Sequence, residues 1–338
     1  MAYFPDNSKD WKKIASLIER SENVFISSHV NPDGDAIGSE MAFAGFLRNM
    51  NKKYRVINHS STPEIYTFLD PENIIESFTE DGSLENSPEK DDIVICLDLG
   101  SFYRLGDIHD FLVNNEAQKI IIDHHIPEPV EADVVVVNSD ASSTASLIYD
   151  LFCYIDISLV DKRVAASLLT AILTDTGYFS YSNTTSTTHH IAAALYNHGA
   201  TASRIRNKID SVQPLFRQKL LGLALTHVQV TDCGRIGYSY LTQSMFKEAG
   251  AQREHTEDII NEIRIIKNIE IAMLFIQETE NKFKISLRSA GAIPVNVIAS
   301  KLGGGGHKKA AGALMEGSLE EVISKALSTA EDVLDDEV

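Results

Sequence analysis

The stretch VFISSHVNPDGDAIGSEMAFAGFLRN, residues 24–49, decides the fold. A short β-rich run opens it, the polar cluster HVNPDGD follows at 29–35, and a helical pattern completes it. Proline and glycine in the cluster break regular structure, which lets His29, Asp33 and Asp35 converge. In open α/β sheets ligands sit beyond the carboxyl ends of strands, so the cluster predicts a ligand site or, equally, a turn in which one Asp caps the helix.

Four more β-rich runs follow along the chain. They are KYRVIN at 53–58, DIVICLD at 92–98, KIIID at 119–123 and VVVVN at 134–138. Helical stretches separate them, and this alternation is typical of βαβ units. Residues 93–97 and 134–137 are continuously apolar, as expected of strands covered on both faces. We predict an α/β fold with an N-terminal doubly wound, mostly parallel sheet and helices on both of its faces.

The pattern changes twice further along the chain. It turns helical from Ser143 to about Leu225, and strands then return in a different mixture with helices. At roughly 150 residues per domain, the length of 338 residues predicts two domains. We predict a first domain at 1–190, a helical linker at 191–225 and a smaller C-terminal mixed α/β domain at 226–338.

The composition is that of an ordinary globular protein, with 43% hydrophobic and 23% charged residues. A formal net charge of −18 argues against a surface that coats duplex DNA, because phosphate neutralisation needs Lys and Arg. We expect no membrane helix, since no run approaches the ~18 apolar residues that a span needs. Three cysteines far apart in the sequence, with no export signal at its start, predict a cytoplasmic protein without disulfides.

Three more acidic positions lie at the ends of predicted elements. Asp98 ends one apolar strand, and Asp175 ends a helical run. Asp123 ends another strand and is followed at once by His124 and His125. A lone aspartate at such a place is often only a cap or a turn. Several carboxylates brought to one crevice without a lysine would repel one another unless cations were bound, which favours a two-metal site.

Two bound cations favour hydrolysis at phosphorus. They hold the substrate oxygens, and one lowers the pKa of a bound water toward about 7, so that hydroxide forms at neutral pH. Asp98, on a central strand, is the natural bridge between the two ions. His124 and His125 cannot face the same way if the strand continues. We therefore assign one to a metal and the other to the substrate phosphate or leaving group.

A second polar motif, GGGGHKK at 303–309, follows a helical pattern. Four glycines let backbone N–H groups wrap an anion, and residues 281–310 carry six Lys or Arg and no Asp or Glu. The spacing is not that of a P-loop. A flexible linker is the alternative, but structured-looking sequence flanks the run closely. We expect an anion-binding loop.

In their order along the chain, these motifs resemble the DHH superfamily of phosphoesterases with a DHH-associated C-terminal domain. The triplet Asp123-His124-His125 gives that family its name, and the resemblance spans nearly the whole chain. The nearest branch contains nanoRNases, pAp phosphatases and phosphodiesterases that cleave cyclic di-AMP or pApA. The resemblance implies that residues 1–190 form the DHH metal-binding catalytic domain and that 226–338 form the DHH-associated substrate-binding domain.

The resemblance also implies roles for individual residues. The first metal ion would take His29, Asp33 and Asp98, and the second Asp35, Asp98, His124 and Asp175. The catalytic group would be Asp98, His124, His125 and Asp123, with Asp123 and His125 in supporting or phosphate-facing places. The substrate would be bound by Arg288, Ser289, Gly303, Gly304, Gly305, Gly306 and His307. Imidazole and carboxylate ligands suit two divalent ions such as manganese, and magnesium or iron are the alternatives.

The expected activity is hydrolysis of nanoRNA, pApA, pAp or cyclic di-AMP to mononucleotides by a homodimer. One alternative is a RecJ-like exonuclease on longer single strands, and another is a non-catalytic nucleotide sensor. A chain of this length has no room for an added oligonucleotide-binding barrel, and no ligand is missing, which weighs against both. Many relatives carry Arg where this chain has Ser180, which bears on substrate preference. Asn183, Thr184 and Thr185 either contact substrate or form a turn and a helix cap.

Overall fold

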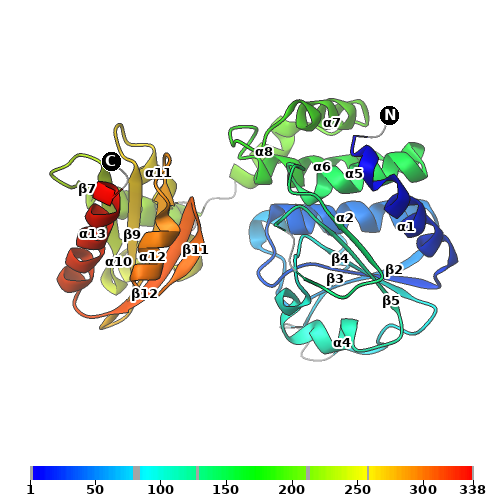
Figure 1. Ribbon diagram of the computed structural model, residues 1–338, viewed down its shortest axis with the longest axis horizontal. Helices are drawn as coiled ribbons and strands as arrows, with labels where there is room; N and C mark the ends of the chain where they lie inside the picture. Colours follow the sequence, from blue (N-terminus) through cyan, green and yellow to red (C-terminus); the bar gives the residue numbers. More distant parts are fainter. Residues whose placement is uncertain (1–2, 79–83, 127–128, 211–213, 257–258, 337–338) are drawn as a thin grey trace. The chain divides into compact units, whose positions relative to one another are not determined.

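The computed structural model describes residues 3–78, 84–126, 129–210, 214–256 and 259–336. The chain divides into two compact units, Met1–Val212 and Gln213–Val338. The helices of the segment 191–225 are shared between these units, because α7 and α8 lie in the first and α9 in the second (Figure 1).

The first unit is built on a parallel sheet in the order β3-β2-β1-β4-β5-β6. Its strands are β1 (Asn23–Ser27), β2 (Lys53–Asn58), β3 (Ile75–Ser77), β4 (Ile93–Leu97), β5 (Gln118–Asp123) and β6 (Val134–Val137). The strand order reverses between β1 and β4. A site beyond the carboxyl ends of these two strands therefore lies where open α/β sheets bind ligands.

Helices cover both faces of this sheet (Figure 1). The helices are α1 (Ser8–Arg20), α2 (Gly34–Asn49), α4 (His109–Val113), α5 (Thr144–Ile155), α6 (Lys162–Asp175), α7 (Ser186–Asn197) and α8 (Ala202–Asp210). Short 3-10 helices are η1 (Pro5–Asn7), η2 (Glu64–Leu69), η3 (Phe102–Ile108) and η4 (Ile157–Leu159). One apolar core joins α1, α2, α5 and α6 to the sheet, and another joins η3 and α4 to its opposite face. The predicted doubly wound sheet is confirmed.

Two features of this sheet differ from the sequence prediction. Every residue of β4 is buried, as expected, but Val135 in β6 is 40% exposed, because β6 is an edge strand with one face open. The opposite edge is β3, which the sequence did not reveal, because three residues carry too short a pattern to detect.

The second unit contains a mixed sheet in the order β11-β12-β10-β9-β8-β7. Its strands are β7 (Gln229–Val230), β8 (Ile236–Leu241), β9 (Ile271–Thr279), β10 (Lys282–Ser289), β11 (Gly305–His307) and β12 (Ala310–Glu316). Among the described strands of this second sheet, only the β8–β9 pair is parallel. The helices are α9 (Leu215–Thr226), α10 (Gln243–Ala249), α11 (Ile259–Arg264), α12 (Val295–Lys301) and α13 (Leu319–Asp336), with η5 at Arg253–Thr256. The predicted mixed α/β architecture is confirmed.

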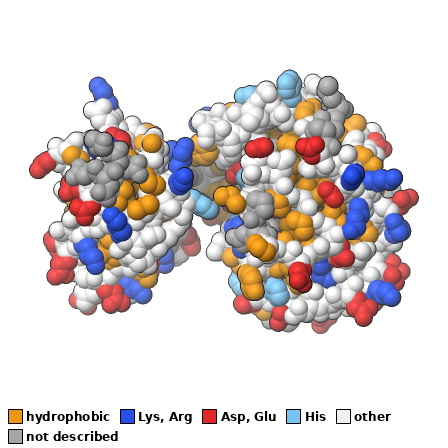
Figure 2. All heavy atoms as spheres, in the orientation of Figure 1, with side chains coloured by type: hydrophobic (Ala, Val, Ile, Leu, Met, Phe, Trp, Pro, Cys, Tyr) orange, Lys and Arg blue, Asp and Glu red, His pale blue; other side chains and the backbone are white. Residues whose placement is uncertain are grey.

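Acidic side chains lie on the visible face of both units, where Figure 2 draws them in red, in keeping with the net charge of −18. Across the described part of the chain, no helix is both long and apolar enough to cross a bilayer.

Candidate metal centre

The polar cluster at 29–35 forms the turn between β1 and α2. Asp33 is the N-cap of α2, and its Oδ1 accepts hydrogen bonds from the backbone N–H groups of Asp35, at 2.9 Å, and Ala36, at 3.1 Å. The capping interpretation is therefore correct for Asp33. The cap occupies only one carboxylate oxygen and leaves Asp33 exposed at the edge of the cluster, where the other oxygen can take a second role.

His29 is buried beside the carboxylate of Asp98. Its Nδ1 lies 2.8 Å from the carbonyl oxygen of Val30, and its Nε2 lies 3.5 Å from Asp98 Oδ2. Since a carbonyl only accepts, Nδ1 carries a proton, and Nε2 is the nitrogen that would face a metal ion, as is typical of metal-ligating histidines. Burial lowers the pKa of His29, but the hydrogen bonds to Asp98 and Val30 outweigh it and raise the pKa overall.

Asp98 occupies the centre of the cluster and is 1% exposed. It follows β4 with φ at 58°, a left-handed conformation that aspartate tolerates better than most residues. Its Oδ2 faces His29, and its Oδ1 lies 3.6 Å from both His124 Nε2 and His125 Nδ1. Burial acts to raise the pKa of Asp98, but the three histidines lower it overall, so the carboxylate is ionised.

The carboxylate of Asp35 is held at the N-terminus of α5. Oδ2 accepts from the backbone N–H of Thr144 at 2.7 Å, and Oδ1 accepts from the N–H of Ala145 at 3.2 Å and from the Ser39 hydroxyl, also at 3.2 Å. The side chain of Thr144 also donates to Asp98 Oδ1, at 3.0 Å. Burial, followed by repulsion from Asp98, raises the pKa of Asp35 well above its usual range.

Asp175, the last residue of α6, completes the far side of the cluster. Its Oδ2 lies 3.5 Å from His124 Nε2, and this buried oxygen accepts no hydrogen bond from the described residues. Burial is the main cause that raises the pKa of Asp175 to about 6. Asn183 donates to the carbonyl oxygen of Asp175 at 3.1 Å, and Thr185 caps α7, so these residues shape the turn that follows the carboxylate.

The histidine pair follows β5, which ends at Asp123. The strand does not continue through the pair, so the condition under which the two rings would face different ways is not met: their centroids are 4.6 Å apart and both approach Asp98. Asp123 Oδ1 accepts from the backbone N–H of His124 and from His125 Nδ1, each at 2.8 Å. The Asp123 hydrogen bond raises the pKa of His125 to about 9, while the positive charge of Arg104 acts against the rise.

Three sets of nitrogen and oxygen atoms could each hold a metal ion, with all atoms of a set within 4.8 Å of one another. They are His29, Asp33 and Asp98; Asp35, His124 and Asp175; and Asp98, His124 and His125. The structure thus brings all the expected metal ligands together. Raised carboxyl pKa values and a buried Asp175 oxygen without a hydrogen-bond donor fit a bound divalent cation, which would neutralise the crowded carboxylates.

The expected substrate residues meet in the second unit. Strand register places Arg288 of β10 opposite Ala310 of β12, and Ala310 opposite His307 of β11, so these three positions form one row across the sheet. Ser289 follows Arg288 in β10 and is buried, with its backbone N–H donating to the carbonyl of Lys309 at 3.0 Å. Positions paired across neighbouring strands share a face, so Arg288 and His307 point to the same side.

The glycine run has a structural role as well. A Cβ on Gly304 would collide with the carbonyl oxygen of Gly312, and a Cβ on Gly306 would lie 2.6 Å from the Cα of Ala311. Both glycines therefore let β11 approach β12 closely. Gly303, with φ at 81°, and Gly305 have open space around them. The run is part of an ordered sheet edge and not a flexible linker.

Thr144 is the residue that the sequence did not single out, although it contacts both Asp35 and Asp98. A signal was present: the run Ser142-Ser143-Thr144 precedes an apolar helix, and Ser143 is indeed its N-cap. Such a run predicts a helix start. Nothing in the run indicates that the N-terminus of this helix would contact the carboxylates of Asp35 and Asp98.

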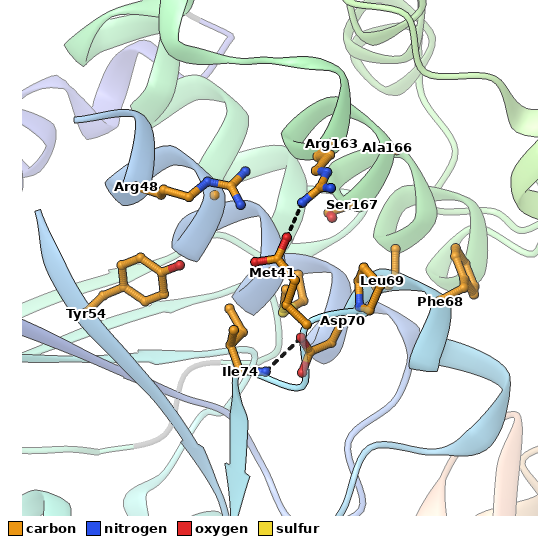
Figure 3. A pocket seen from close by; sticks show the side chains of 13 residues that line it. Met41, Arg48, Tyr54, Phe68, Leu69, Asp70, Ile74, Arg163, Ala166 and Ser167 are labelled. Atoms are coloured by element: carbon orange, nitrogen blue, oxygen red, sulfur yellow. Dashed lines mark hydrogen bonds and ion pairs between the residues drawn. The ribbon is translucent and has the colours of Figure 1, made fainter. Parts of the chain in front are cut away.

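A separate cavity of about 150 Å³ opens beside α2 and α6 in the first unit. Figure 3 shows apolar side chains such as Met41, Phe68 and Leu69 around it, with Arg48 and Arg163 above. Arg163 is paired with Glu72 at 2.5 Å. None of the metal-ligand or substrate residues discussed above lines this cavity, so it is distinct from the metal centre.

Known proteins resemble the chain in sequence and in fold. The chain is 28% identical to the bifunctional oligoribonuclease and PAP phosphatase NrnA of Thermus thermophilus, over 96% of this chain and 95% of that one. It is 27% identical to the cyclic-di-AMP phosphodiesterase PdeA of Listeria monocytogenes, over 93% of this chain and 48% of PdeA. The crystal structure of an exopolyphosphatase-related protein from Bacteroides fragilis superposes with a TM-score of 0.87 at 27% identity, covering 97% of this chain and 96% of that one.

The two units correspond to two known domains. Residues 23–174 match the DHH family, N-terminal domain, and residues 237–336 match the DHHA1 domain. The first match contains five of the six proposed metal ligands and ends one residue before the sixth, Asp175. The second match contains the row formed by Arg288, Ala310 and His307. The chain therefore belongs to the DHH family of phosphoesterases and carries a DHHA1 domain as its second unit.

Proposed function

We propose that the chain is a two-metal, manganese-dependent hydrolase that releases mononucleotides from short oligoribonucleotides and small adenine nucleotides. The observation that carries the proposal is the position of Asp98. One of its oxygens faces His29, and the other faces His124. A single carboxylate placed in this way can bridge two ions, each of which then has ligands of its own.

The side chains divide into two ligand sets that share Asp98. His29 and Asp33 would hold one divalent ion, and Asp35, His124 and Asp175 the other. Bound ions would polarise the phosphoryl oxygens and lower the pKa of a water, which makes a nucleophile at neutral pH. Carboxylate and imidazole ligands suit manganese, which supports this metal over softer ions.

Asp123 and His125 serve a different purpose in this proposal. Asp123 accepts the Nδ1 proton of His125 and so keeps that imidazole charged near neutral pH, with its pKa raised to about 9. His125 is 39% exposed in its side chain, which leaves it accessible to a substrate oxygen. The charged ring would hold the phosphate or donate a proton to the leaving oxygen.

The second unit would bind the part of the substrate that lies away from the cleaved phosphate. Arg288 and His307 lie in one row on one face of its sheet, beside the glycine run 303–306. A guanidinium and an imidazole beside a glycine-rich turn suit a phosphate or a terminal nucleotide. The names of the relatives, an oligoribonuclease and PAP phosphatase and a cyclic-di-AMP phosphodiesterase, support short nucleotides as the substrate class.

A substrate panel tests the proposal. The purified protein is assayed with manganese against pAp, pApA, cyclic di-AMP, a five-residue oligoribonucleotide and a long single strand, and the products are separated by chromatography. We expect rapid release of mononucleotides from the short substrates and little from the long strand. Faster cleavage of the long strand would instead identify a processive exonuclease. Tight binding without turnover, across several divalent metals, would identify a nucleotide sensor.

Ser180 makes the panel informative about specificity. It lies in the exposed turn after Asp175, where its backbone N–H donates to the carbonyl of Thr176 at 2.9 Å. The hydroxyl of Ser180 offers no positive charge to a substrate phosphate, so the comparison of pApA with pAp in the panel shows which of the two the protein prefers. The homodimer and the cytoplasmic location expected from the sequence stay predictions.

A further inference from the structure

Two large apolar side chains stand in solvent on the loops that follow Asp98 and His125. Tyr103 is 91% exposed and Ile126 is 77% exposed, the two highest fractions among the large apolar side chains of the described residues. Tyr103 lies in η3, which follows β4 and Asp98, and Ile126 comes directly after His125. Single exposed apolar side chains are ordinary, so it is the position of these two, on loops that carry proposed catalytic residues, that makes them candidates for a ligand surface.

Both loops are fixed against the metal centre. The carbonyl oxygen of Arg104 accepts from the backbone N–H of Val30 at 2.7 Å, and Val30 follows His29. A Cβ on Gly100 would lie 3.4 Å from Asp123 Oδ2 and 3.8 Å from the carbonyl oxygen of Ile126. The loop after β4 therefore packs between the loops that follow β1 and β5.

The exposure of Tyr103 does not come from a loosely attached loop. Phe102, Leu105 and Ile108 in the same 3-10 helix are buried in the core on that face of the sheet. These side chains occupy the inner face of η3, so the Tyr103 ring is turned outward. The ring also lies nearly parallel to that of His109, at 10° between the planes and 6.4 Å between the centroids. A stable, outward-facing ring is a surface on which a planar group can stack.

We propose that Tyr103, with Ile126 on the adjacent loop, is the subsite of the first unit for a nucleobase of the substrate. The inference rests on the proposed function, because it takes the substrate to be a nucleotide chain. A nucleobase is the planar group that accompanies a phosphate in such a substrate. Stacking on an exposed aromatic ring accepts every base and is worth about 1–3 kcal/mol for each one. The subsite would hold the base next to the phosphate that is cleaved, without selecting its identity.

The test compares Tyr103→Ala with Tyr103→Phe on pApA and on analogues of pApA in which one base or the other is absent. Tyr103→Ala should raise the KM for pApA about tenfold with little change in kcat, as expected for the loss of one stacked base. Tyr103→Phe keeps the ring and should match the wild type. On the analogue that lacks the stacked base, Tyr103→Ala and the wild type should be equal. Tyr154→Ala, which removes an exposed tyrosine from α5, is the matched control.

An unchanged KM for pApA in Tyr103→Ala would overturn the inference. So would an equal rise in KM on pApA and on both analogues, because the ring would then act on something other than a base. Calorimetric binding of pApA separates this inference from the proposed function. If the wild type binds but does not cleave pApA, the proposed function fails, and weaker binding by Tyr103→Ala still supports the subsite. Equal binding by both proteins refutes it.

Discussion

The hydroxyl of Thr144 donates to Asp98 Oδ1 over 3.0 Å, while the backbone N–H of the same residue donates to Asp35 Oδ2 over 2.7 Å. One residue at the start of α5 therefore orients both Asp98, which the two proposed ligand sets share, and Asp35, which belongs to one of them. Hydrogen bonds of this kind fix a ligand before the metal arrives and are worth about 10- to 100-fold in metal affinity.

Thr144→Val removes the hydroxyl and keeps the shape and the backbone N–H. We expect manganese affinity to fall by about 10- to 100-fold, with a loss in the free energy of unfolding of about 1 kcal/mol. Calorimetric titration with manganese measures the first and urea unfolding the second. Thr144→Ser keeps the donor and should behave as the wild type. Wild-type manganese affinity in Thr144→Val would show that the hydroxyl does not orient Asp98.

Glu40 gives the stability of the protein a dependence on pH. This residue of α2 is fully buried, and one of its oxygens accepts from Asn58 at 2.9 Å. Burial is the largest cause that raises its pKa from 4.5 to about 7. Between these values the native state holds a proton that the unfolded state has lost, so the contribution of Glu40 to stability falls as pH rises.

Glu40→Gln mimics the protonated carboxyl at every pH. The free energy of unfolding of Glu40→Gln, minus that of the wild type, should rise by up to about 3 kcal/mol between pH 5 and pH 8. Urea unfolding at the two pH values measures the change, and Glu64→Gln on the exposed surface should show none. If the difference in free energy of unfolding between Glu40→Gln and the wild type were the same at both pH values, the pKa of Glu40 would not be raised.

Neighbouring glycines in the run 303–306 provide a matched pair. A Cβ on Gly304 would collide with the backbone of β12 and lie 2.6 Å from the Cα of Ala313, whereas a Cβ on Gly305 meets no atom within 4 Å. Gly304→Ala should destabilise the protein by about 1–3 kcal/mol and weaken nucleotide binding, because β11 must shift. Gly305→Ala should leave both unchanged. Thermal unfolding and calorimetry measure the two effects, and equal behaviour of the two variants would contradict the packing role of Gly304.

Asp150 holds residues 3–11 through hydrogen bonds. This buried carboxylate accepts from the backbone N–H of Tyr3 at 2.6 Å and from Trp11 Nε1 at 2.9 Å. Asp150→Asn leaves at least one donor unpaired and should cost about 2–4 kcal/mol. Trp11 is the single tryptophan of the chain, so its fluorescence reports the loss directly. Asp232→Asn, exposed in the second unit, is the control, and an unshifted unfolding midpoint in Asp150→Asn would contradict this role.

Much of the fold and of the metal centre could be predicted from the sequence, because both depend on local patterns. The apolar run of β5 ends at Asp123, and the turn after β1 contains His29 and Asp33. In a parallel sheet all strand ends meet at one edge, so those residues had to converge. The burial of β4 follows from its uniform apolar sequence, whereas β6 has the same kind of sequence and lies at an edge. Position within a sheet is not a local property.

The orientation of side chains that meet across long sequence separations could not be predicted. Thr144 is 109 residues from Asp35, and the sequence around either residue carries no sign of the other. The same is true of the Tyr103 loop, whose place depends on the hydrogen bond between Val30 and Arg104. The relative direction of the His124 and His125 rings depended on where β5 stopped. These features follow from packing in three dimensions, which no single stretch of sequence specifies.

The bridging role of Asp98 is the central claim, and Asp98→Asn tests it most directly. Asparagine tolerates the left-handed conformation at φ 58° and keeps the size of the side chain, so the substitution removes the charge with little strain. The measurement is the number of manganese ions bound per chain, taken together with the rate of pApA hydrolysis, with the exposed Asp107→Asn as control. We predict two ions and rapid hydrolysis in the wild type and in Asp107→Asn. We predict fewer than two ions and a loss of at least about 1,000-fold in rate in Asp98→Asn, the scale of several kcal/mol of transition-state stabilisation. Two tightly bound ions and full activity in Asp98→Asn would contradict the account.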